Sequence, residues 1–141
     1  MSHNMTMTQP NTVSVRIPIR LVSTPNVHEH WRRKWHREKQ QQKIVRLMLN
    51  PIRHAVVLPC TVTFVKQGPR ILDDDNFLAS LKHIRDEVAD WLIPGQRKGI
   101  ADSDPRITWQ YRQEKSKTYA LLIEITTPAE TALHSHGCNP S

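Results

Sequence analysis

The apolar positions of the chain alternate between strand and helix spacing, which predicts a small α/β (α+β) domain with a mixed sheet. Segment 14–20 has apolar residues at every second position, the period of a half-buried strand, and Pro18 marks it as an edge strand. Three further segments are rich in residues with high β propensity and predict strands: 61–66, 106–113 and 118–126. The last two are expected to form a hairpin through the charged turn 114–117.

Two segments have the spacing of helices. Segment 28–50 is long and basic, contains scattered apolar residues and stops at Pro51. Segment 75–92 repeats apolar residues every three or four positions, which gives one stripe: Phe77, Leu78, Leu81, Ile84, Val88, Trp91 and Leu92. At about 100° per residue, Asp75, Lys82 and Asp86 lie within about 40° of one another, opposite that stripe.

These elements suggest one domain, residues 13–126, between flexible tails at 1–12 and 127–141. The N-terminal segment lacks the apolar region of a signal peptide, and no run reaches the roughly 18 apolar residues of a membrane span. We therefore expect a cytoplasmic protein without a membrane partner. Cys60 and Cys138 are far apart, so both are expected to be free thiols.

Charge is distributed unevenly along this sequence. Lys and Arg outnumber Asp and Glu by 20 to 13, which indicates a polyanionic partner such as nucleic acid. The acidic residues nevertheless gather in two short segments, 72–76 and 101–105. Carboxylates on a phosphate-binding surface repel the ligand unless a divalent cation lies between them. The pattern therefore suggests a metal-dependent nuclease.

The spacing of the acidic residues suggests how a cation would be held. In an extended segment Asp73 and Asp75 project to the same side, and Asp102 or Asp104 from the later loop would complete the set. Mg²⁺ takes few protein carboxylates and completes its shell with water and phosphate oxygens. Lys82 is then expected to contact the phosphate or the transition state.

A simpler interpretation stays open for the same residues. Acidic residues at a helix start act as N-caps and compensate the helix dipole, and Asp-Ser-Asp-Pro is an ordinary turn. Under that interpretation the chain is a non-catalytic DNA-binding protein. A calcium-binding EF-hand is excluded, because counting from Asp73 puts Leu78 and Ile84 where such a loop needs Gly and Glu.

The basic segment 28–50 is expected to contact DNA, since it contains almost no acidic residues. Its candidates for phosphate contacts are Arg32, Arg33, Lys34, His36, Arg37, Lys39 and Lys43. Trp31 and Trp35 are expected to pack in the core or a dimer interface rather than stack on bases. Arg70 and His83 flank the acidic segment, where they could reach a phosphate, although simple solvation at the surface explains them equally well.

Two other kinds of site are not expected. The tail sequence from His134 to Cys138 has no companion Cys or His cluster and does not predict a zinc site. The four glycines are too scattered for a phosphate-cradling loop or a dinucleotide fingerprint, so no nucleotide cofactor is expected.

Taken together, the acidic motifs resemble a known family. Asp73-x-Asp75-Asn76, a helix with Lys82-x-x-x-Asp86, a Gly-containing loop and Asp102 before a strand are similar to the RusA-type Holliday junction resolvases, particularly phage and prophage members. The resemblance covers most of the chain outside the tails. Lys82 lies six residues after Asn76, whereas some family members have the lysine three residues after it. Ala101 stands where many relatives have another aspartate, so Asp102 is the position assigned.

The resemblance implies a function and a set of site residues. Asp73, Asp75 and Asp102 would be catalytic carboxylates that bind Mg²⁺ or Mn²⁺, Lys82 would be the basic catalytic residue, and Asp86 and Asp104 would be accessory positions. The implied protein is a homodimeric endodeoxyribonuclease with a RusA-like α/β fold that resolves branched DNA by paired nicks in recombination and repair. The DNA contacts assigned with it are Arg32, Arg33, Lys34, Arg37, Arg70 and Lys82.

Overall fold

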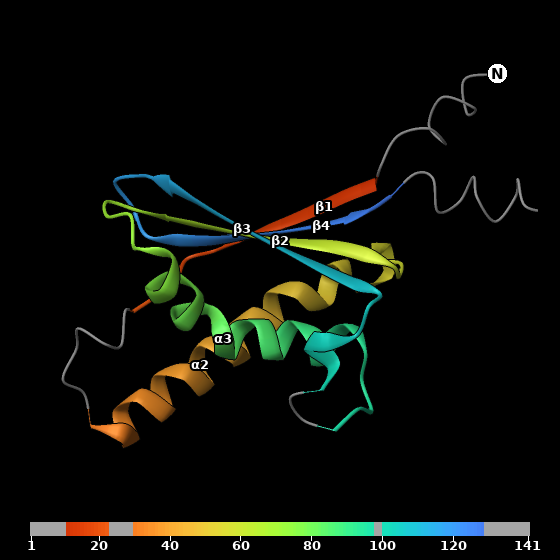
Figure 1. Ribbon diagram of the computed structural model, residues 1–141, viewed down its shortest axis with the longest axis horizontal. Helices are drawn as coiled ribbons and strands as arrows, with labels where there is room; N and C mark the ends of the chain where they lie inside the picture. Colours follow the sequence, from red (N-terminus) through yellow and green to blue (C-terminus); the bar gives the residue numbers. More distant parts are fainter. Residues whose placement is uncertain (1–10, 23–29, 98–99, 129–141) are drawn as a thin grey trace, which may run out of the picture.

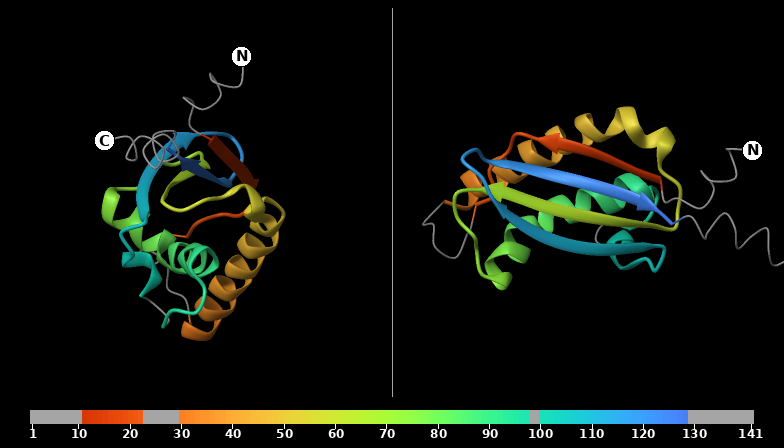
Figure 2. Two further views of the ribbon diagram at one scale, coloured as in Figure 1. Left: turned by 90° about the vertical axis from the view of Figure 1, so that its right-hand side faces the viewer. Right: turned by 90° about the horizontal axis from the view of Figure 1, so that it is seen from above.

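Four strands form one mixed sheet, and two long helices lie against one of its faces (Figures 1 and 2). The computed structural model describes residues 11–22, 30–97 and 100–128. The elements follow in the order β1 (Asn11–Ile17), α2 (Trp31–Leu49), η2 (Asn50–Ala55), β2 (Cys60–Gly68), α3 (Asp74–Leu92), η3 (Ala101–Ser103), β3 (Ile107–Lys115) and β4 (Ala120–Thr127). The expected mixed α+β class is confirmed. Most of the two expected tails lies outside the described residues.

The sheet has the strand order β1-β4-β2-β3, visible from above in Figure 2. β4 is antiparallel to both β1 and β2, whereas β3 is parallel to β2. The expected β1 edge strand is confirmed, but the expected hairpin between β3 and β4 is wrong because β2 lies between them. The link from β3 to β4 passes the end of β2, where the Ser116 amide donates to the Gly68 carbonyl at 2.8 Å.

The central position of β2 follows from its side chains. Val62 and Phe64 are fully buried on the side of the helices, and Val65 is fully buried on the other face of the strand. A strand that is buried on both faces suits the interior of a sheet. At its end a Cβ on Gly68 would lie 3.0 Å from the Tyr119 ring, so glycine lets the returning chain approach closely.

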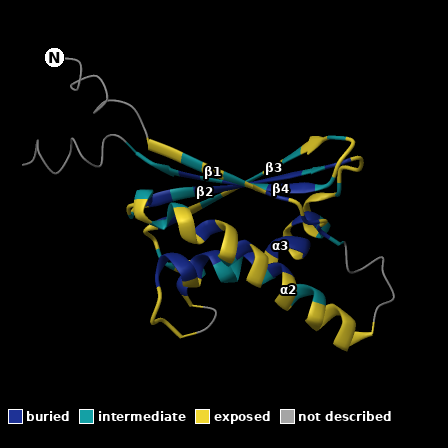
Figure 3. Ribbon diagram, turned by 180° about the vertical axis from the view of Figure 1, so that it is seen from behind, coloured by how far each residue is buried: buried dark blue, intermediate teal, exposed yellow. Residues whose placement is uncertain are grey.

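The core lies between the sheet and the helices, and α3 contributes most of the helical part (Figure 3). α3 buries eight side chains: Phe77, Ser80, Leu81, Ile84, Val88, Ala89, Trp91 and Leu92. The expected apolar stripe is therefore confirmed except at Leu78, which is exposed. The helix ends before Pro94, and Gly95 follows with φ +91°, a backbone conformation that glycine adopts without strain.

α2 agrees with the expected helix in its position but not in its packing. It buries only Gln41, Val45 and Leu49, and its first half is exposed (Figure 3). Trp31 and Trp35 do not pack in the core, because both rings lie at the surface, and their expected alternative place in a dimer interface stays a prediction. Three further apolar side chains of this helix are also exposed: Ile44, Leu47 and Met48. The helix extends beyond the core, so its apolar residues do not form one buried stripe.

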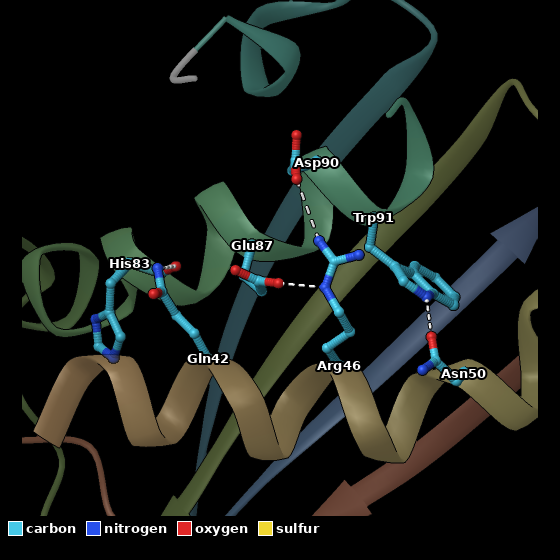
Figure 4. Close-up of polar contacts among 7 residues, drawn as sticks. All are labelled: Gln42, Arg46, Asn50, His83, Glu87, Asp90 and Trp91. Carbon is cyan, nitrogen blue, oxygen red and sulfur yellow. Dashed lines mark hydrogen bonds and ion pairs between the residues drawn. The ribbon is translucent and has the colours of Figure 1, made fainter. Parts of the chain in front are cut away.

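Polar contacts join the two helices where they cross (Figure 4). Arg46 of α2 forms ion pairs with Glu87 and Asp90 of α3. At one side of this bridge the Gln42 side chain donates to the His83 carbonyl at 2.8 Å. At the other side the Trp91 indole donates to the Asn50 side chain at 2.9 Å. These contacts fix α3, which carries the candidate site, against α2.

The expectations about the cysteines and about membrane-spanning segments can be compared with this fold. Cys60 is a buried free thiol, as expected, and burial raises its pKa to about 11. Cys138 and the His134–Cys138 segment lie outside the described residues. Among the helices that the structure describes, none is long and apolar enough to cross a membrane.

Candidate functional site

The acidic motif lies where the chain leaves β2 and enters α3. Two side chains from the sheet hold the segment that leads into it. The ammonium group of the buried Lys66 donates a hydrogen bond to the Arg70 carbonyl at 2.7 Å. The pKa of Lys66 is lowered mainly by burial and, to a smaller extent, by the positive charge of Arg20. The Gln113 side chain accepts from the Leu72 amide at 2.9 Å and donates to its carbonyl at 2.8 Å. The position of the motif is therefore set by β2 and β3.

Asp73 is the N-cap of α3. Its Oδ1 accepts from the Asn76 backbone amide at 2.9 Å, and its Oδ2 accepts from the Asn76 side chain at 3.1 Å. Because the helix starts at Asp74, Asp75 belongs to its first turn and not to an extended segment. The alternation expected to align Asp73 with Asp75 therefore does not occur. Asp75 is exposed, and within the described residues its carboxylate has no hydrogen bond or ion pair.

The outer face of α3 carries the expected charges. Asp75 and Lys82 are exposed and Asp86 is partly buried, while Leu81 and Ile84 on the opposite side are in the core. The Lys82 ammonium lies 3.6 Å from the Asp86 carboxylate, four residues further along the helix. The helical-wheel arrangement predicted from the sequence is confirmed.

Asp102 comes to α3 from the loop that follows the helix. Its backbone carbonyl accepts from the Trp109 indole at 2.8 Å and from Arg85 at 3.4 Å, and its carboxylate lies 3.6 Å from the Arg85 Nε. It borders two cavities. One, of about 380 Å³, is also lined by Lys82, Arg85 and Tyr111. The other, of about 240 Å³, also contains Lys39 and Asp86.

Asp104 behaves as the turn residue of the simpler interpretation. Both its oxygens accept hydrogen bonds from the Arg106 side chain at 3.0 Å, and its Oδ1 also accepts from the Arg106 backbone amide at 2.9 Å. The hydrogen bonds from Arg106 lower the pKa of this carboxyl group. Asp104 is thereby paired within its own turn rather than with the other acidic residues.

The three expected metal ligands do not form a ready-made site. Across residues 11–22, 30–97 and 100–128, no three Asp, Glu, His or Cys side chains are placed so that they could hold a metal ion together. Asp73 is engaged as a cap and Asp102 faces Arg85, which leaves Asp75 as the carboxylate open to a cation. The oxygen donors suit Mg²⁺ in their chemistry, but the protein alone does not assemble them into a three-carboxylate site.

The residues expected to bind DNA lie on exposed surfaces. Six of the seven candidates on α2 are exposed, namely Arg32, Arg33, Lys34, His36, Lys39 and Lys43, and Arg37 is partly exposed. Arg70 is exposed just before the acidic motif, next to the start of α3. His83, in contrast, is mostly buried between the helices, where its Nε2 lies 2.7 Å from the Gln41 side-chain oxygen. It is therefore a packing residue, and it does not face solvent as the sequence interpretation expected.

Arg85 is the main site residue that the sequence analysis missed. It donates to the Tyr111 hydroxyl at 2.6 Å, lies 5.0 Å from the Trp109 ring centroid and borders the same cavity as Lys82 and Asp102. The signal in the sequence is its position three residues after Lys82, which puts the two cations on neighbouring faces of one helix.

In comparisons with known proteins, no family model and no curated protein matches the chain.

Proposed function

We propose that the protein is a metal-dependent endodeoxyribonuclease that resolves branched DNA, including Holliday junctions, in the manner of the RusA-type resolvases that its motifs resemble. One observation carries the proposal. Asp102 shares one cavity with Lys82 and another with Asp86, although it reaches them from a separate loop. Two carboxylates from distant segments, Asp86 and Asp102, thus lie near the Lys82 ammonium group at the outer face of α3, and this grouping supports a role in phosphodiester hydrolysis with a bound cation.

The roles assigned to the residues follow from their positions. Asp75, with its open carboxylate, is the main ligand for Mg²⁺ or Mn²⁺, and Asp73 and Asp102 are proposed to join it when DNA is present. Carboxylate, phosphate and water oxygens are the ligands that Mg²⁺ prefers. The ion would supply Lewis-acid activation of the phosphate. Lys82 and Arg85 stabilise negative charge on the substrate.

The surroundings of the site suit a DNA substrate. Among the exposed cations of α2, Lys39 lies at the site itself, because it lines the same cavity as Asp86 and Asp102. A homodimer would present two such sites for paired nicks, as its two-fold symmetry matches two symmetric strands. A cytoplasmic location agrees with the free thiol of Cys60, since cytosolic thiols are kept reduced.

A second function is favoured by a different set of observations. Asp73 caps a helix and Asp104 closes a turn, as ordinary structural carboxylates do. No three-ligand metal group is present within the described parts of the chain. The second candidate is therefore a non-catalytic DNA-binding protein whose affinity comes from α2.

Cleavage of a four-way junction by the Asp75→Asn variant distinguishes the two functions. A labelled junction and a linear duplex of equal length are incubated with Mg²⁺ or with EDTA. Asp74→Asn is the matched control, because Asp74 is the exposed neighbour outside the Asp73-x-Asp75-Asn76 pattern. The nuclease proposal expects Asp75→Asn to reduce cleavage on the order of a thousandfold and Asp74→Asn to leave it nearly unchanged.

Binding is measured on the same variants in EDTA. Removing the Asp75 charge beside phosphate should preserve junction binding or make it tighter. Paired nicks that require both Mg²⁺ and Asp75 would support the nuclease. Tight, metal-independent binding without nicks would support the binding protein instead, and undiminished cutting by Asp75→Asn would show that the proposed site is wrong.

A further inference from the structure

Two large aromatic side chains lie at the surface near the start of α2. Trp31 is 66% exposed and Trp35 is 52% exposed. They are four residues apart, so their side chains project from the same side of the helix. An indole ring in water leaves a large apolar area unburied, so the two rings form an exposed aromatic surface at this end of the helix. A ligand with flat apolar faces would fit this surface.

The surface around the two rings is positively charged. The Arg32 guanidinium lies 5.2 Å from the Trp31 ring centroid, and the Lys39 ammonium lies 5.7 Å from that of Trp35. Lys34 is exposed next to Trp35 on the neighbouring side of the helix, whereas Arg33, also exposed, projects from the opposite side. Glu38 is the only acidic residue in the α2 sequence, and its carboxylate lies 3.7 Å from His83 rather than beside the tryptophans. The ligand should therefore carry negative charge as well as flat apolar faces.

A second copy of the chain fits this surface poorly. A two-fold interface centred on the tryptophans would place the same cations of both copies opposite one another, which is repulsive. Single-stranded or branched DNA supplies what the surface lacks, namely phosphates for the cations and base faces for the rings. In a continuous duplex the base faces are already stacked inside the helix, so only unpaired bases can use the tryptophans.

The aromatic surface also adjoins the candidate site. Lys39 lies over the Trp35 ring and borders the cavity of about 240 Å³ that contains Asp86 and Asp102. Lys39 could therefore contact the phosphate of a nucleotide stacked on Trp35. This connection gives the two tryptophans a role in choosing which DNA reaches the site.

We propose that Trp31 and Trp35 form a stacking platform for unpaired bases, so that the protein selects DNA with unpaired nucleotides at or near a branch point. This inference rests on the proposed function, since it names the DNA structure that the site would receive. The platform itself acts in binding, which can be measured without cleavage.

The test uses the full chain in EDTA, with fluorescence anisotropy of three labelled probes: an oligo-dT strand, a four-way junction with unpaired nucleotides at its branch point, and a linear duplex. Trp35→Ala and Trp31→Ala should each weaken binding to the first two probes by about 5- to 150-fold, the range for loss of one stacked base. Binding to the duplex should change by less than about twofold. Trp35→Phe should recover most of the loss, because phenylalanine keeps an aromatic face.

Leu47→Ala is the matched control, because Leu47 is 60% exposed on the same helix but lies away from the tryptophans in its second half. It should bind all three probes like the wild type. The proposal is overturned if the tryptophan variants lose affinity equally for all probes, if they lose none, or if the wild type binds neither oligo-dT nor the junction. It is also overturned if sedimentation shows that Trp35→Ala converts a dimer into monomers, which would make the surface an interface between copies.

Failure of the proposed function would look different. If the wild type made no nicks with Mg²⁺ while binding still depended on the tryptophans, the nuclease would be wrong and the platform would belong to a binding protein. If Asp75-dependent nicking were found and the tryptophan variants bound normally, only the platform would be wrong.

Discussion

The two long helices are both 19 residues long, but they differ in how much of their surface packs in the core. α3 buries eight side chains and uses its opposite face to carry Asp75, Lys82 and Asp86. α2 buries three side chains, and its first half extends from the core as a cationic, aromatic surface. Stability and the candidate chemistry are thus combined on α3, whereas the first half of α2 is available for binding.

The difference shows how a small domain can change its substrate contacts without losing its fold. A substitution on the first half of α2 removes little buried surface, so its main effect should be on affinity. On α3 a substitution acts on the fold or on the candidate site according to which face it lies on. Substitutions on the two helices test this division.

Replacing an isoleucine by alanine should reduce the free energy of unfolding much more on α3 than on α2. Ile84 of α3 is fully buried, whereas Ile44 of α2 is 37% exposed. Ile84→Ala should lower the free energy of unfolding by about 4 kcal/mol, because it leaves a cavity in the core. Ile44→Ala should lower it by less than about 1 kcal/mol, since alanine also favours the helix. Urea unfolding measures both, and similar losses would refute the division between the helices.

The contact between the helices should make stability depend on pH through His83. Burial, followed by the charges of Arg37 and Lys34, lowers the pKa of His83 from 6.5 to about 4. The folded state thus keeps the ring neutral while the unfolded state takes up a proton below pH 6.5. The stabilisation is complete above pH 6.5 and is lost as the pH falls towards 4, by roughly 3 kcal/mol in all.

The groups that face His83 define the control for this prediction. Gln41 lies 2.7 Å from its Nε2, and Glu38 lies 3.7 Å from its Nδ1 and would favour the charged ring. His83→Gln keeps a polar partner for Gln41 but cannot titrate. Denaturant unfolding of both proteins from pH 7.5 to 4 should give a steeper loss for the wild type. Parallel curves would mean that His83 does not couple folding to pH.

The elements of the fold were largely predictable because their signals are local. The apolar stripe of α3 and the alternation in β1 reflect burial on one face, and burial on one face follows from a fixed period along the sequence. The pairing of β3 with β2 was not predictable in this way. Two strands joined by a short charged link look like a hairpin, whereas the insertion of β2 between them depends on contacts between segments that are distant in sequence.

The candidate site was predictable on α3 but not around it. Asp75, Lys82 and Asp86 share a helix face, which the helical period fixes. The approach of Asp102 to Arg85 depends on the path of the loop after α3, and a sequence pattern does not determine that path. The exposure of Trp31 and Trp35 depends on how far α2 extends beyond the sheet, which is a property of the assembled fold.

Asp73 gives the smallest expected change in stability and separates its two proposed roles. Asp73→Ala should lower the free energy of unfolding by about 1 kcal/mol, because the Asn76 amide loses its cap. Asp73→Ser restores a capping oxygen, so its stability should stay within about 0.5 kcal/mol of the wild type. Junction cleavage should nevertheless be lost in both variants, since serine cannot supply the carboxylate proposed to join Asp75. Thermal melting and junction cleavage measured on the same samples decide the point, because full cutting by the stable serine variant would mean that Asp73 is only a cap.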